Sequence, residues 1–196
     1  KDVLNAFMRI PDSSGWDHPK HFARGGNVQL AQAFAEFAKE HPTRAIELIE
    51  LFQPEFGQRA AGYAIEALAE RHDANDLMAL AVALHRRGFQ SEEFIDSIAR
   101  AVVRLLERRL AVDQNALQIL ESWLFRRQPV PKETYELEEE SPPKNDSFLL
   151  SGHQGMDLVP SGDYPVVSAL VQARLATRDV ATVIQLLRRF LSHSQD

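Results

Sequence analysis

The sequence predicts an all-α protein, and three observations support this class. Apolar residues recur at helical spacing from Asn27 to about Phe125, strand-like alternation is almost absent, and the connections between segments are short. A chain of 196 residues is long enough to bury roughly 70% of its unfolded surface, which suffices for one stable domain. The absence of cysteine excludes a disulfide framework and thiolate chemistry.

The first helices are delimited by proline. Lys1 opens on a helical segment, and residues 27–40 form an amphipathic helix that ends before Pro42. Its inward stripe consists of Leu30, Ala31, Phe34, Phe37 and Ala38. A second helix follows and stops at Pro54, with Ile46, Ile49 and either Leu48 or Phe52 facing inward.

The next helices are delimited by capping residues. Asp73 is a predicted N-cap for the helix that ends before Gly88, a predicted C′ glycine behind a basic last turn. Ser91 is a predicted N-cap for the following helix, and another helix starts at Asp113 and runs to Arg126. We therefore expect two further helix pairs between residues 57 and 127.

Residues 128–163 interrupt this pattern. Gln128 to Ser147 contains four prolines and an acidic run from Glu136 to Glu140, which predicts a long loop. A glycine-containing segment around His153 follows it. Two more helices are predicted over 164–176 and 178–192. The first buries Val166, Val167, Leu170 and Leu175, and the second carries Val180, Ile184, Leu187 and Leu191 on one face.

The helices pair at intervals of about thirty to forty residues with short turns, which predicts antiparallel pairs stacked as an α-solenoid of tetratricopeptide or HEAT-like type. Ala60, Ala61, Ala64 and Ala67 would permit the close helix approach that such a stack needs. An irregular helical bundle is the alternative. Residues 1–127 would form the repeat region, 128–163 the loop and 164–196 a helix pair packed on the same domain.

The charge balance favours a protein partner. The net charge is −6, which disfavours the phosphate neutralisation on which nucleic-acid binding depends. No segment has the apolar length of a membrane helix, and the start lacks the pattern of a signal peptide, so we expect a cytoplasmic protein. No phosphate-binding glycine motif of the P-loop type is present, and no cofactor is predicted.

One histidine pair offers a candidate metal site. Asp17, His18 and His21 supply a carboxylate and two imidazoles that could hold zinc or iron, although Pro19 makes a continuous helix there doubtful. Ser151, His153 and Asp157 contain the residue types of a hydrolase triad but lack the strand-to-helix turn that positions such a serine.

Several side chains are candidate partner contacts. Arg100, Arg104 and Arg108 lie at i, i+4 and i+8, where they could bind an acidic partner. The simpler interpretation is a solvated face, with Asp96 four residues before Arg100. A further hypothesis places the acidic run Glu136 to Glu140 on these arginines. The other candidates are Trp123, Tyr135, His153 and Tyr164.

The segment from Phe148 to Phe190 resembles part of a known class of proteins. Its glycine-containing "SGHQG" and the "SGDYPVVSAL" before a helix pair resemble the helical-repeat regions of large bacterial signal-transducing NTPases of the STAND class. This resemblance implies a sensor-like repeat region from a signalling or defence protein whose nucleotide-binding module lies elsewhere.

Three functions follow from the sequence. The first is a non-enzymatic helical-repeat module or scaffold for protein recognition. The second is a HEAT-like module that binds or processes nucleic acid along a basic groove. The third is a metal-dependent helical enzyme built around His18 and His21.

Overall fold

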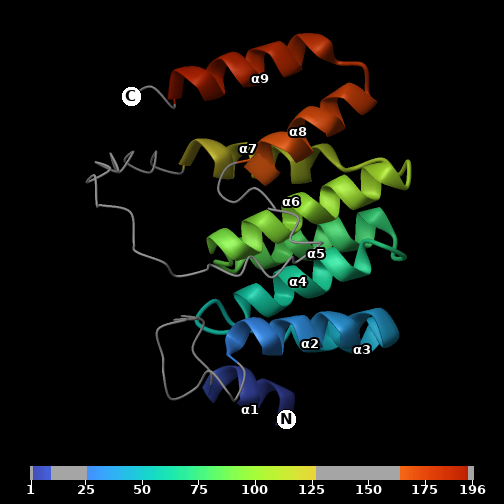
Figure 1. Cartoon of the computed structure of the whole chain (residues 1–196), viewed down its shortest axis with the longest axis vertical. Coiled ribbons are helices and arrows are strands. Elements are labelled where there is room, and N and C mark those ends of the chain that lie inside the picture. Colours follow the sequence, from blue (N-terminus) through green and yellow to red (C-terminus); the bar gives the residue numbers. More distant parts are fainter. Residues whose placement is uncertain (1, 10–25, 127–163, 194–196) are drawn as a thin grey trace, which may run out of the picture.

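The computed structural model describes residues 2–9, 26–126 and 164–193, and Figure 1 shows that this part of the chain is built from helices. They are α1 (Asp2–Arg9), α2 (Asn27–Glu40), α3 (Pro42–Ile49), α4 (Gln58–Leu68), α5 (Ala74–Arg86), α6 (Glu92–Glu107), α7 (Gln114–Arg126), α8 (Tyr164–Ala176) and α9 (Val180–His193). The all-α prediction is confirmed for these residues, which contain no strand. Within the described ranges, no helix combines the length and apolar character needed to cross a bilayer.

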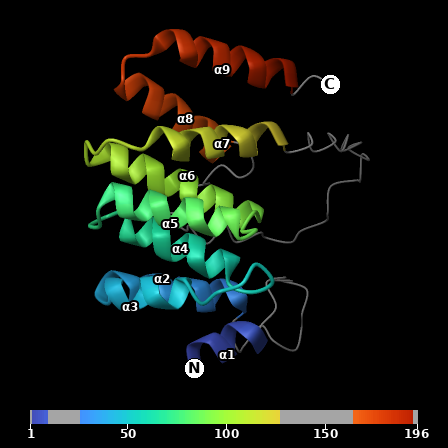
Figure 2. The same cartoon turned by 180° about the vertical axis from the view of Figure 1, so that it is seen from behind.

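Alternate helices pack on one another along the long axis of the molecule. The most extensive contacts join α2 to α4, α4 to α6 and α6 to α8. These four helices lie one above another in Figure 1, and the view from behind in Figure 2 shows α3, α5 and α7 on the opposite side. Because α8 also contacts α7, the last helix pair packs directly on the helices of residues 1–127.

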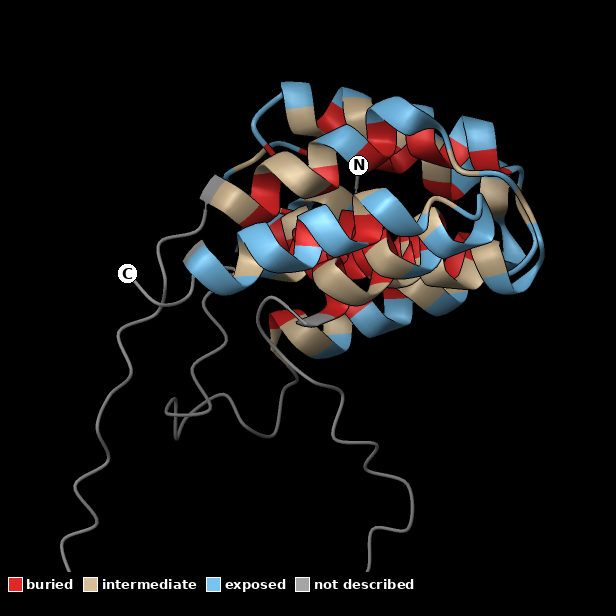
Figure 3. Ribbon diagram, turned by 90° about the horizontal axis from the view of Figure 1, so that it is seen from above, coloured by how far each residue is buried: buried red, intermediate tan, exposed pale blue. Residues whose placement is uncertain are grey.

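The core runs the length of the molecule as one apolar cluster with members from α1 to α9. Figure 3 looks down the stack and shows buried residues concentrated between the helices. The predicted small residues Ala60, Ala61, Ala64 and Ala67 are all buried on α4. Because methyl side chains keep the helices close, α4 can pack on α2 and α6 at once.

Three phenylalanines fix α1 to the rest of the molecule. Phe7 on α1 meets Phe34 on α2 and Phe52, just after α3, with ring centroids 5.8 and 5.1 Å apart and edge-to-face geometry. Edge-to-face pairs of aromatic rings add to the stabilisation that apolar burial gives. This short helix is therefore held chiefly by one buried ring.

The predicted N-caps are confirmed. The Asp73 carboxylate accepts hydrogen bonds from the backbone N–H groups of Asn75 and Asp76 at 2.8 and 3.3 Å. The Ser91 hydroxyl accepts one from the N–H of Phe94 at 3.3 Å. These bonds satisfy donors that the first turn of a helix leaves without partners.

Three helices end in the same backbone motif. Gly88 after α5 has φ +100°, as the predicted C′ glycine requires, whereas Arg109 after α6 and Arg178 after α8 adopt φ of 60° with side chains. In each case the N–H of this residue bonds a carbonyl three residues back, at 2.9, 2.8 and 2.9 Å respectively. The N–H of the following residue bonds a carbonyl five residues back, which completes a Schellman motif.

The last helix pair corrects one prediction and qualifies another. Leu175 was expected in the core face of α8, but its side chain is exposed. The predicted apolar face of α9, beginning at Val180, is exposed along its length, and Val183 and Leu186 enter the core instead. The physical reason is that the apolar arc of α9 is wider than the surface that the rest of the stack covers.

Candidate functional site

A groove of about 570 Å³ crosses the stacked helices α2, α4 and α6. Small, polar and charged side chains line its walls. They are Gln32, Ala33, Ala35, Glu36, Lys39, Tyr63, Glu66, Ala67, Glu70, Arg100 and Arg104. The groove follows from the layered packing, because its lining residues lie on helices of the same layer except for Glu70, which lies in the turn after α4.

Gly62 sets the distance between α4 and α6 beside this groove. A Cβ atom at this position would lie 2.9 Å from the Cβ of Ser97 and 3.2 Å from the Cα of Phe94, both on α6. Contacts this short leave room for hydrogen alone, so the two backbones meet here as closely as packing permits. This close approach brings the long side chains of α6 within reach of the acidic residues on α4.

Glu66 is the centre of an ion-pair network between α4 and α6. Its Oε2 accepts a hydrogen bond from Nε of Arg100 at 2.9 Å, and its Oε1 accepts one from Nη2 of Arg104 at 2.8 Å. The Glu66 side chain is only 15% exposed. Charge-assisted hydrogen bonds in partly desolvated surroundings are stronger than exposed ones, so this carboxylate holds both guanidinium groups in place.

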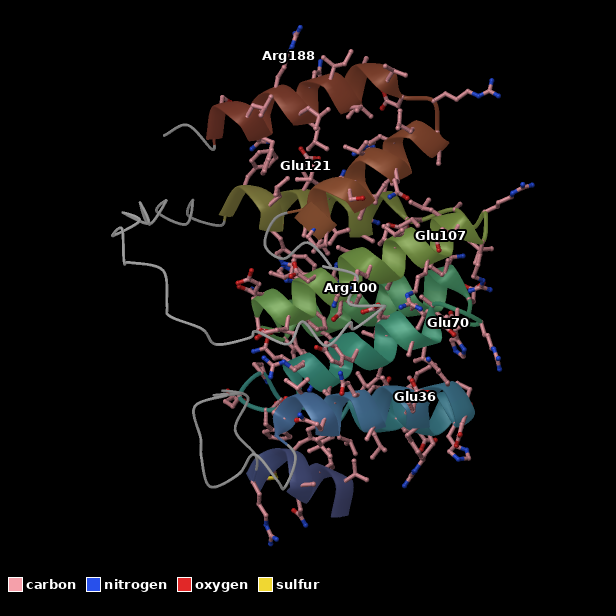
Figure 4. All side chains as sticks on the ribbon, in the orientation of Figure 1. Glu36, Glu70, Arg100, Glu107, Glu121 and Arg188 are labelled. Carbon is pink, nitrogen blue, oxygen red and sulfur yellow. The ribbon has the colours of Figure 1, made fainter. Side chains whose placement is uncertain are left out.

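The network continues across the groove to α2. Arg104 also donates to Glu70 at 2.6 Å, and Lys39 on α2 lies 3.8 Å from the same Glu70 oxygen. Lys39 in turn donates to Glu36 at 3.0 Å. Figure 4 shows Glu36, Glu70 and Arg100 on the face formed by α2, α4 and α6. Three cationic and three anionic side chains thus line the groove, and their formal charges cancel.

The third predicted arginine has a different role. Nη1 of Arg108 donates to the backbone carbonyls of Ala69 and His72, both at 2.8 Å. Carbonyls after a helix C-terminus lack partners within the helix and attract cations. Arg108 therefore caps the end of α4 while remaining exposed, and all three predicted arginines bind groups of α4 or of the turn that follows it.

Glu93 forms a further link at the start of α6. The buried guanidinium of Arg59 on α4 donates to its carboxylate. Burial raises the pKa of Glu93. A backbone hydrogen bond, the hydrogen bond and positive charge of Arg59, and a side-chain hydrogen bond with Ser91 lower it. Together they outweigh burial and hold the pKa below its ordinary value. The ionised form of Glu93 is thus favoured in the folded protein.

Trp123 lies in the core instead of at a contact surface. Its indole is buried, and its Nε1 donates to Nδ1 of His85 at 2.8 Å. The ring also packs edge-on against Phe94 with centroids 6.2 Å apart. A surface partner cannot contact the indole in this arrangement, because the packing of α5, α6 and α7 encloses it.

Other predicted residues fall where the structure gives no side-chain detail. Tyr164 is the first residue of α8, and its side chain is not described. The partner candidates Tyr135 and His153, the proposed acidic contact Glu136 to Glu140 and the metal candidates Asp17, His18 and His21 lie outside the described residues. Among the described residues, no group of three metal-ligating side chains is placed to hold an ion.

Sequence reasoning missed Lys39, Glu66 and Glu70 as groove residues. A signal was present, because three ion pairs between α4 and α6 each join residues 34 positions apart, namely Arg59 with Glu93, Glu66 with Arg100, and Glu70 with Arg104. Opposite charges that recur at one long separation predict facing positions on two packed helices. Comparison with known proteins gave no match to a family model, a curated protein or a solved structure.

Proposed function

We propose that this chain is a non-enzymatic helical-repeat module that binds another protein in the groove across α2, α4 and α6. The architecture proposed for it is an α-solenoid of tetratricopeptide-like type. Three of the four ion pairs that Arg59, Glu66 and Glu70 make with α6 join residues 34 positions apart, which supports this architecture because 34 is the length of a tetratricopeptide repeat. Stacked repeats present elongated surfaces, which they commonly use for binding.

The observation that carries the proposal is the groove itself, with its balanced charges. Ala33, Ala35 and Ala67 have side chains of a single methyl group, so the backbone of a bound segment can come close to the helices. Lys39 and Arg104 supply hydrogen-bond donors, and Glu36 and Glu70 supply acceptors. A polypeptide offers both kinds of group at short intervals, and it suits this lining better than a uniformly charged ligand.

The alternative of nucleic-acid binding receives less support from this surface. A phosphate backbone is bound by a surplus of cations, whereas the guanidinium groups of Arg100 and Arg104 are engaged by Glu66 and Glu70. The metal-dependent enzyme rests on residues outside the described ranges. A place in a larger bacterial signalling or defence protein rests only on the resemblance of residues 148–190 to STAND-class repeats. The reading frame upstream of Lys1 tests it, because a P-loop module is expected there.

A photo-crosslinking experiment tests the groove. Gln32 is exposed and lines it, so p-benzoylphenylalanine at this position is expected to give a discrete protein adduct in cells. The matched control places the same group at Gln118, an exposed residue of α7 that does not line the groove. Lys39→Glu, in the chain that carries the crosslinker at position 32, is expected to abolish the adduct. It replaces a hydrogen-bond donor by a carboxylate, which repels the neighbouring carboxylates of Glu36 and Glu70.

Two outcomes would contradict the proposal. A crosslinked species that disappears on nuclease treatment would favour the nucleic-acid alternative. If positions 32 and 118 crosslinked the same proteins in the same yield, the groove would have no special role in recognition.

A further inference from the structure

The outward face of α9 is an exposed row of branched apolar side chains. Val180, Ile184 and Leu187 are 54%, 46% and 37% exposed, and they follow one another at i, i+4 and i+7. Leu175 at the end of α8 is 49% exposed, and Leu191 continues the row at 58%. Single exposed apolar residues are ordinary on protein surfaces, but a continuous row along one helix marks an interaction surface.

The spacing of this row indicates the shape of what would cover it. Side chains at i, i+4 and i+7 form a ridge along a helix, and such ridges pack into the grooves of another helix. Val183 and Leu186 of α9 illustrate this within the molecule, since they are buried against the preceding helices. The exposed row is the uncovered half of the same apolar arc.

The charges around the row identify the chemistry of the partner. The sequences of α8 and α9 contain Arg174, Arg188 and Arg189 and no acidic residue. Arg174 and Arg189 lie 4.0 and 3.4 Å from the carboxylate of Glu121 on α7, and Arg189 also stacks on the ring of Phe125 at 3.8 Å. These two arginines are thus directed back toward α7.

Two further arginines border the exposed row. Arg188 on α9 points away from the stack in Figure 4, and Arg178 lies in the turn before α9. No salt bridge to either guanidinium is found among the described residues. The end of the stack therefore presents an apolar row with basic residues beside it, on a chain whose net charge is −6.

We propose that the outward face of α9 docks an amphipathic α-helix of another protein, with acidic residues beside the apolar row of that helix. The row of Val180, Ile184 and Leu187 would pack against the apolar residues of the partner, and Arg178 and Arg188 would pair with its carboxylates. This surface is separate from the groove across α2, α4 and α6, so the inference goes beyond the proposed function.

Charge argues against the two other occupants. Two copies of α9 packed row to row would bring arginines together, and the nearby carboxylate of Asp179 already accepts a hydrogen bond from a backbone N–H in the first turn of α9. An amphipathic helix that binds a membrane typically carries several outward lysines or arginines and exposed aromatic residues. In α9, Arg189 is held by Glu121 and Phe125 on α7. The aromatic residue of α9, Phe190, is half-buried in the core. Both occupants remain outcomes of the test.

The probe for this surface is a designed helical peptide labelled with a fluorophore. It carries leucines at i, i+4 and i+7 flanked by glutamates, and a matched peptide carries lysines in place of the glutamates. We expect fluorescence anisotropy to show that the glutamate peptide binds the full chain at least about tenfold more tightly than the lysine peptide. Ile184→Ser combined with Leu187→Ser should weaken this binding by about tenfold or more.

Charge exchange provides the sharper test. Arg188→Glu is expected to weaken binding of the glutamate peptide and strengthen binding of the lysine peptide. Lys39→Glu, in the groove, should leave both affinities unchanged, which separates failure of this inference from failure of the groove proposal. Circular dichroism should show the same helicity for every variant, because all the substituted side chains are at least partly exposed.

Three results would overturn the inference. One is equal affinity of the two peptides with no effect of Arg188→Glu. The second is a concentration-dependent dimer in light scattering that Ile184→Ser and Leu187→Ser abolish, because it would identify a second copy as the occupant. The third is binding to vesicles of phosphatidylcholine and phosphatidylserine that the same pair of substitutions abolishes.

Discussion

Glu66 on α4 accepts a hydrogen bond from Arg100 on α6 across a sequence separation of 34 residues, with Oε2 and Nε 2.9 Å apart. The same carboxylate holds Arg104, so one side chain fixes the two arginines that line the groove. Because Glu66 and Glu70 compensate these guanidinium groups, the groove is a mixed surface. Glu66 thus contributes to the balanced charge of the candidate binding site together with Glu36 and Glu70.

Replacing this carboxylate should be costly. Glu66→Gln removes the charge that compensates two partly buried guanidinium groups, and we expect the free energy of unfolding to fall by about 1–2 kcal/mol. Urea denaturation monitored by circular dichroism measures this change. The matched control is Glu47→Gln, which breaks an exposed pair with Arg44 and should change the stability by less than about 0.5 kcal/mol. Equal effects of both substitutions would contradict the prediction.

Gly62→Ala should destabilise the protein although alanine is the better helix former. The added methyl group would lie 2.9 Å from the Cβ of Ser97, so α4 and α6 must separate, at an expected net cost of about 1–3 kcal/mol. Removing the opposing side chain provides the control. When Ser97→Gly is combined with Gly62→Ala, it should recover part of the lost thermal stability. A double variant whose loss equals the sum of the two single losses would refute the steric explanation.

The left-handed residues after α5 and α6 predict opposite effects of glycine. Arg109 has φ 60°, a conformation that disfavours side chains, so Arg109→Gly should raise the free energy of unfolding by about 0.5 kcal/mol. Gly88→Ala places a side chain at φ +100° and should lower it by about 1 kcal/mol. Chemical denaturation of both variants checks the pair. A loss of stability in Arg109→Gly would mean that its side chain, and not its backbone, matters there.

Glu93 predicts a dependence of stability on pH. Its pKa is lowered from 4.5 in the folded state, so its contribution is present in full above that value and is lost as the pH falls through the lower, folded pKa. The stability difference between the natural protein and Glu93→Gln should therefore be larger at neutral pH than near about pH 3. Urea titrations at both pH values measure it, with Glu55→Gln, at an exposed carboxylate, as the control. A difference that does not vary with pH would exclude this linkage.

Local features of the fold could be predicted from the sequence because they depend on neighbouring residues. Asp73, Ser91 and Gly88 act at helix ends through hydrogen bonds and dihedral angles that span at most five residues. The stop at Pro42 has the same origin, since proline cannot donate within a helix and instead starts α3. Helix positions were therefore accessible without any knowledge of the tertiary structure.

Contacts between helices were harder to predict, because they depend on which face meets which neighbour. Leu175 belongs to an apolar pattern that is correct for a helix, but periodicity does not say how much of an apolar arc the rest of the protein covers. Trp123 shows the converse, since an aromatic residue near a helix end is typical of a surface contact, but here its indole is buried against His85. The spacing of Arg100 and Arg104 places them on one face of α6, yet their acidic partners lie 34 or 38 residues earlier in the sequence.

The ordered contacts of α2 with α4, α4 with α6 and α6 with α8 have a consequence for how the molecule opens. Each helix in this series is held by its neighbours along the stack, and no single centre connects them all. Stability should then be graded along the long axis, with the slowest amide hydrogen exchange in α4 and α6 and progressively faster exchange toward α9. Unfolding from one end leaves the contacts between the interior helices intact, so a partner bound near α9 could detach part of the stack without unfolding the remainder.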